Sequence, residues 1–114
     1  MGWRRQNYEL EAHLFKVPTP RLFRRKMGEL ERTSYEDGEE RLKISFHGID
    51  APDGAVVALV IDGRTIANLP VERGAVRKIP SSREAAAVPE VKAGQTVEIH
   101  LLGKAVLAGV FRPN

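Results

Sequence analysis

Three histidines, His13, His47 and His100, are the side chains in this sequence best suited to hold a metal ion. Imidazole nitrogens bind zinc and similar ions, and a carboxylate such as Glu11 or Glu98 would complete four ligands. No two of these histidines have the spacing of a local chelate, so they would meet only if the fold brought separate strands together. Solvated histidines are the preferred interpretation, and the sequence predicts no metal site and no cofactor.

Paired carboxylates are the second group with possible chemistry. Glu9 and Glu11 form one pair, and Glu29 and Glu31 form another. Glycosidases place their two carboxylates on opposite sides of a cleft, whereas each pair here falls on one face of a single expected strand. We interpret both pairs as solvated strand faces. There is also no Gly-x-Ser-x-Gly elbow, no phosphate-binding glycine loop and no cysteine, so the sequence predicts a protein without catalytic residues.

Six basic residues cluster near the amino terminus and form the best candidate contact for a polyanion. Phe23 and Trp3 lie among them, and basic residues beside aromatic ones bind single-stranded nucleic acid by charge and stacking. The net charge of +3 and the acidic residues that follow argue against a strongly polycationic binder. Polyanion or single-stranded nucleic-acid binding through residues 21–26 is the alternative function. The contacting residues would be Arg4, Arg5, Arg21, Arg24, Arg25 and Lys26.

Composition predicts one folded domain. The chain has 114 residues, of which 42% are hydrophobic and 29% charged, as in ordinary globular proteins. It has no apolar run long enough to span a membrane. The first fifteen residues lack the apolar core of a signal peptide, so none is expected. Without cysteine, disulfides are excluded.

The clearest structural signal is residues 55–71, where two apolar runs meet at Asp62-Gly63. An Asp-Gly pair between β-branched runs predicts a hairpin with a type I′ turn, which needs positive φ at both central residues. Residues 56–61 are apolar at every position, which predicts a strand inside the sheet. Pro70 cannot donate to a ladder, so the second arm is expected at an edge or bulge.

Alternating patterns predict further strands at residues 8–14, 41–47, 76–79, 95–102 and 105–111. Residues 21–32 fit either a helix or a loop followed by a strand. Gly28 disfavours the helix, so we expect a loop through Lys26 and a strand from Gly28 to Tyr35. About eight short strands with tight turns indicate an all-β fold, an antiparallel β-sandwich or small barrel. We divide the chain into a polar arm, residues 1–7, and a single β domain, residues 8–114.

From Glu40 onward the sequence resembles a family of small bacterial β-sandwich domains of unassigned function, common in secreted and envelope proteins. The shared pattern comprises a strand, a Gly-aliphatic step, a Pro-x-Gly loop, a hairpin and a closing pair of strands. In this chain those features are residues 41–46, Gly48-Ile49, Pro52-Asp53-Gly54, residues 59–63, 95–99 and 106–111. The resemblance implies an extracellular or envelope setting. Its motifs are turn and core residues, so it implies a fold and no chemistry.

The first strand suggests a mode of action for such a domain. A loop of about ten residues bounded by prolines separates it from the main body, so it can complete its own sheet or that of a neighbouring copy. The preferred function is therefore a non-catalytic structural or adhesion module that self-associates, with other copies of itself as partners. The face of the possible assembly strand consists of Tyr8, Leu10, Ala12 and Leu14.

Overall fold

The computed structural model describes residues 6–18, 24–81 and 88–113, with side chains described from Tyr8 onward. This part of the chain contains eight antiparallel strands and no helix, which confirms the predicted all-β class. No helix long and apolar enough to cross a membrane occurs among these residues. The strands are β1 (Gln6–Lys16), β2 (Lys26–Tyr35), β3 (Glu40–Phe46), β4 (Val56–Ile61), β5 (Arg64–Pro70), β6 (Val76–Lys78), β7 (Thr96–Leu101) and β8 (Lys104–Pro113).

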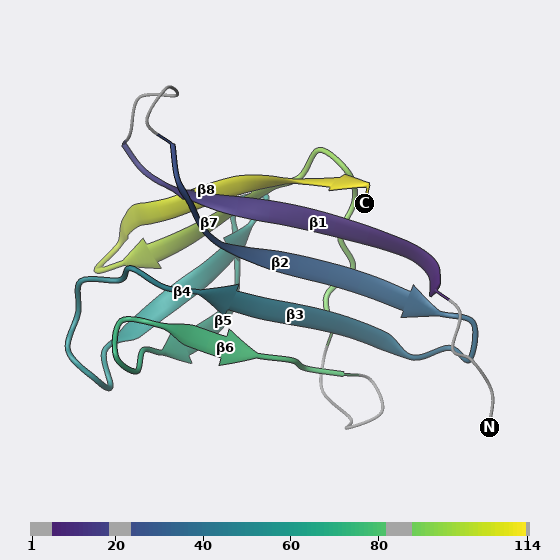
Figure 1. Ribbon diagram of the computed structural model, residues 1–114, viewed down its shortest axis with the longest axis horizontal. Coiled ribbons are helices and arrows are strands. Elements are labelled where there is room, and N and C mark those ends of the chain that lie inside the picture. Colours follow the sequence, from purple (N-terminus) through teal and green to yellow (C-terminus); the bar gives the residue numbers. More distant parts are fainter. Residues whose placement is uncertain (1–5, 19–23, 82–87, 114) are drawn as a thin grey trace.

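All eight strands belong to one sheet, in the order β5-β4-β7-β8-β1-β2-β3-β6. The sheet curls until it is nearly closed into a barrel (Figure 1). The first strand lies in the middle of the sheet, hydrogen-bonded to β2 on one side and to the last strand, β8, on the other. In the described residues β5 and β6 do not pair with each other, so they are the two edges.

The core fills the inside of the curled sheet. Alternation sends one face of a strand inward, most clearly in β3, where Leu42, Ile44 and Phe46 are each at most 2% exposed. Each such side chain contributes about 1.5–3 kcal/mol by leaving water. On β1 the pattern holds for three of the four expected residues. Leu10, Ala12 and Leu14 are buried, whereas Tyr8 is 45% exposed beside an irregularity in the β1–β2 register.

The predicted hairpin at Asp62-Gly63 is present. Asp62 has φ 51° and Gly63 has φ 79°, the positive values that a type I′ turn requires. Val56 to Ile61 lies between β5 and β7, and β5 is an edge strand, both as expected. The outer side of β4 is only partly covered, because Val60 is 6% exposed but Val56 is 53% exposed.

β2 begins at Lys26, two residues before the expected start, and passes very close to β3 at Gly28. A Cβ added to Gly28 would lie 2.3 Å from the Ser45 carbonyl oxygen and 2.4 Å from the Phe46 Cα. Glycine is therefore required where the two backbones approach, as the sheet curls. Residues 19–23, which include part of the ambiguous segment, lie outside the described residues.

The connection between β6 and β7 covers one end of the core. Pro80 accepts a hydrogen bond from the Leu42 N–H at 3.0 Å, and Val91 is 3% exposed among the core residues. Arg32 of β2 holds this connection from inside, because its Nε donates to the Pro89 carbonyl at 2.9 Å. Arg32 is itself 1% exposed and forms an ion pair with Glu40, with 3.2 Å between Nη2 and Oε1.

Candidate functional site

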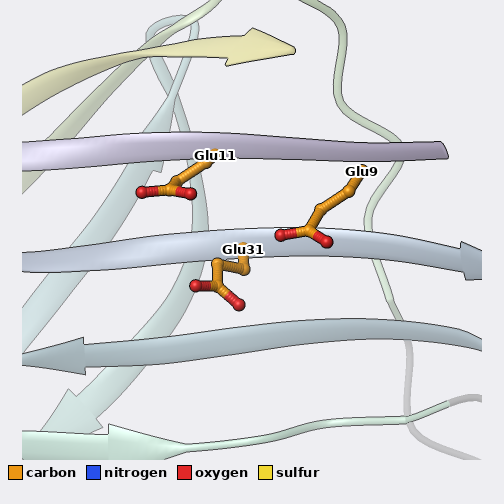
Figure 2. Close-up of side chains that lie close together, drawn as sticks. All are labelled: Glu9, Glu11 and Glu31. Atoms are coloured by element: carbon orange, nitrogen blue, oxygen red, sulfur yellow. The ribbon is translucent and has the colours of Figure 1, made fainter. Parts of the chain in front are cut away.

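Four carboxylates gather on the outer face of the β1–β2 pair. The register places Glu11 opposite Glu31 and His13 opposite Glu29, while Glu9 lies two residues from Glu11 on the same face. One carboxylate oxygen from each of Glu9, Glu11 and Glu31 lies within 4.8 Å of the other two. Figure 2 shows these three side chains close together above adjacent strands. We call Glu9, Glu11, Glu29 and Glu31 the acidic cluster.

Two members of the acidic cluster share a proton. The hydrogen bond that the Glu31 acid donates to the Glu29 carboxylate, with partial burial and the neighbouring Glu29 charge, raises the pKa of Glu31 to about 7. The same hydrogen bond, aided by Lys26, lowers the pKa of Glu29 from its ordinary value of 4.5. Lys26 Nζ lies 3.2 Å from Glu29 Oε1. Adjacent carboxylates cannot both ionise freely, so Glu31 holds its proton until the pH rises to about 7.

The Glu31 pKa leads to a testable prediction about stability and pH. Glu31 titrates near 4.5 when unfolded and near 7 when folded. Its contribution to stability is therefore complete below pH 4.5 and is lost as the pH rises through 7. The depressed pKa of Glu29 acts oppositely, and its contribution is lost as the pH falls below 4.5. Glu31→Gln imitates the protonated acid. We therefore expect the free energy of unfolding of this variant at pH 8 to be about 0.5–1 kcal/mol higher than that of the parent protein, a gain that stays small because the pair is partly exposed.

Urea unfolding at pH 5 and pH 8 measures this effect. The stability gained by Glu31→Gln over the parent protein should be present at pH 8 and small at pH 5. Glu36→Gln, in the exposed turn between β2 and β3, is the control and should behave alike at both pH values. An equal difference for Glu31→Gln at both pH values would contradict the shared proton.

The sequence interpretation of the acid pairs was incomplete, because it treated each pair as a separate solvated face. Pairing of β1 with β2 joins them into one cluster. The sequence contained part of the signal, because two successive strands carry acids at alternate positions, but the acids meet only in the register that the structure shows. Three carboxylate oxygens at these separations have the chemistry of a hard-cation ligand set. In this structure the cluster lies on the outer face of a sheet, where Glu11 contacts His13 and Glu29 contacts the cationic Lys26.

The three histidines lie in different parts of the sheet. His13 on β1 contacts Glu11, and His100 on β7 lies 3.1 Å from Glu98, with β8 between the two strands. His47 follows β3, and its backbone N–H donates to the Met27 carbonyl. Each histidine therefore has its own local surroundings.

The predicted basic residues are only partly described, since Arg4, Arg5 and Arg21 lie outside the described residues. Arg24, Arg25 and Lys26 are all exposed just before or at the start of β2. Arg24 extends over the outer face of β1, where its guanidinium carbon lies 3.9 Å from the centre of the Phe15 ring. The contact with Phe15 was not expected from the sequence.

Two adjoining hollows lie on this outer face, over β1, β8 and β7. Their volumes are about 530 and 320 Å³, and both are lined by Phe15, Arg24, Gly109 and Val110. Arg112 lines the first hollow and Glu98 the second. We call the combined feature the β8 groove.

Comparisons of the chain with protein-family models, with curated proteins and with solved structures found no match in any of the three.

Proposed function

We propose that this chain is a non-catalytic structural module that works by assembling with other copies of itself. The observation that carries the proposal is the open sheet: eight strands end at β5, whose outer edge has no paired strand in the described residues. Unpaired N–H and C=O groups along an edge strand recruit another strand.

β5 is the better of the two edges for such a contact. It has seven residues, whereas β6 has three, and a short edge strand offers few hydrogen bonds. The one charged residue of β5 is Arg64, at its beginning. Two copies of β5 paired antiparallel about Ala67 would place each Arg64 opposite Pro70 and keep the two cations apart. A two-fold contact of this kind is self-complementary.

Exchange of β1, the assembly route predicted from the sequence, is the more demanding alternative. β1 is hydrogen-bonded along both of its edges within its own chain. Both ladders would have to open before β1 could occupy the same position in a neighbouring copy. For this reason we place the assembly contact at the β5 edge.

Adding positive charge to the β5 edge tests the proposal. Thr65 and Asn68 are exposed, so Thr65→Lys with Asn68→Lys should leave the fold intact while bringing cations together across a paired edge. We expect multi-angle light scattering to give a dimer or larger species for the parent protein and a monomer for this variant. Pro52→Lys with Leu102→Lys adds the same charge at exposed turn positions, and this control should assemble like the parent. A parent protein that stays monomeric up to its solubility limit would refute assembly.

A cysteine pair distinguishes the two assembly routes, since the chain has no cysteine of its own. Glu11 of β1 and Arg112 of β8 are partners in the ladder. With Glu11→Cys and Arg112→Cys, an edge contact gives crosslinks within one chain, whereas β1 exchange gives crosslinked dimers. Non-reducing electrophoresis separates the two outcomes.

Polyanion binding is the second candidate function, favoured by the exposed run Arg24, Arg25 and Lys26. Glu29 offsets part of this charge through its ion pair with Lys26. Binding of a single-stranded oligonucleotide should weaken steeply with salt if several phosphates are contacted. Binding that is absent at low salt would exclude this function.

A further inference from the structure

The β8 groove results from a small residue on β8 between larger ones on its two neighbouring strands. Ala108 is the ladder partner of Phe15 on β1 and of Glu98 on β7. A methyl group between a phenyl ring and a glutamate leaves the surface low along the middle strand. Gly109, the next residue, faces the inside of the sheet opposite Val97, and a Cβ there would lie 2.1 Å from the His13 carbonyl oxygen, so β8 runs very close to β1 beside the groove.

The groove offers apolar surface that the core does not use. Val110 is 36% exposed and Phe15 is half-buried, and both line the two hollows. The larger hollow, of about 530 Å³, falls within the range of small-molecule sites, which is roughly 300–1,000 Å³. An apolar body can therefore rest against Phe15 and Val110.

The charges around the groove favour an anion. Arg24 and Arg112 line it, and within the described residues neither forms an ion pair with a carboxylate. The two acids of the groove each contact a histidine: Glu11 contacts His13, and Glu98 lies 3.1 Å from His100. Stacking on Phe15 holds the Arg24 guanidinium at the wall shared by both hollows. Two arginines beside an apolar floor suit a carboxylate or sulfonate attached to a flat apolar body.

We propose that the β8 groove binds a small organic anion, with the acidic group between Arg24 and Arg112 and the apolar body against Phe15 and Val110. A long polyanion suits the groove less well, because its repeated phosphates would approach Glu11 and Glu98 at the two hollows. The site lies on the outer face of the sheet, away from the β5 edge, and is independent of the assembly proposed above. The Thr65→Lys, Asn68→Lys variant should therefore bind the same anion as the parent protein.

Titration of the full chain with 2-naphthoate, followed by the amide resonances of β8 in NMR spectra, tests the proposal. We expect shifts concentrated at residues 108–112. Binding of the neutral analogue 2-naphthol should be weaker by about tenfold, because the charge-assisted hydrogen bonds are lost. Acetate, which has the charge without the apolar body, should also bind more weakly.

Variants locate the site. Arg24→Gln and Arg112→Gln should each weaken naphthoate binding by about tenfold. Arg64→Gln, on exposed β5, is the matched control and should bind like the parent protein. Ala108→Phe should fill the groove and abolish binding, while an unchanged thermal unfolding curve shows that the fold is retained. Undiminished binding by a folded Ala108→Phe protein would overturn the proposal. So would a protein that ignores naphthoate but binds oligothymidylate in a strongly salt-dependent manner, which would favour the polyanion function.

Discussion

Arg32→Ala is expected to lower the free energy of unfolding by about 4 kcal/mol, through the cavity left by a buried side chain and the hydrogen bonds it removes. Arg32 is 1% exposed and occupies an inward position between Leu10 and Leu42. Its guanidinium contacts the Pro89 carbonyl, the Ser34 hydroxyl and Glu40, so it joins the covering connection to the wall of the sheet. A loss of this size is a large share of the 5–15 kcal/mol typical of a small domain.

Urea unfolding of three variants separates the contributions of Arg32. Arg32→Met restores much of the volume without the donors, so its loss should be about half that of Arg32→Ala. Arg64→Ala, at an exposed edge position, should change stability by less than about 0.5 kcal/mol. If Arg32→Ala unfolded at the same urea concentration as the parent, the covering connection would not depend on this side chain.

Gly28→Ala is expected to cost about 3 kcal/mol, because no rotamer can relieve a clash between a Cβ and a neighbouring backbone. The added atom would lie 2.3 Å from the Ser45 carbonyl oxygen, so β2 and β3 would have to move apart where the sheet curls. That separation would also loosen the packing of Leu30 on β2 against Ile44, its partner on β3. Thermal or urea unfolding measures the loss.

Gly94→Ala is the control for this prediction. Gly94 has φ 91°, and a Cβ there would meet no atom within 4 Å, so alanine adds only backbone strain of about 1 kcal/mol. A Gly28→Ala protein no less stable than Gly94→Ala would show that β2 and β3 can separate freely.

Local patterns were enough to predict the individual strands. Asp62-Gly63 predicted its own turn, since the positive φ values are a property of those two residues. The apolar run Val56–Ile61 predicted a strand inside the sheet, and Pro70 predicted an edge. In each case the backbone preference or the side-chain pattern that determines the structure involves only a few consecutive residues.

Contacts between distant segments were not predictable in this way. The pairing of β1 with β8 joins Ala12 to Phe111, and no local signal fixes that neighbour. The choice between a sandwich and a barrel depends on this pairing, and so does the β8 groove. Arg32 was missed for a different reason: alternation from Leu30 places it inward, but an arginine is ordinarily expected in solvent.

The position of β1 between β8 and β2 also affects folding during translation. β1 and β2 leave the ribosome before β8 and can form a hairpin, but one edge of that hairpin must wait for β8, about ninety residues later in the sequence. Until then the growing chain exposes an unsatisfied strand edge beside Leu10, Ala12 and Leu14, and exposed apolar side chains next to an unpaired edge make an incomplete fold prone to aggregate.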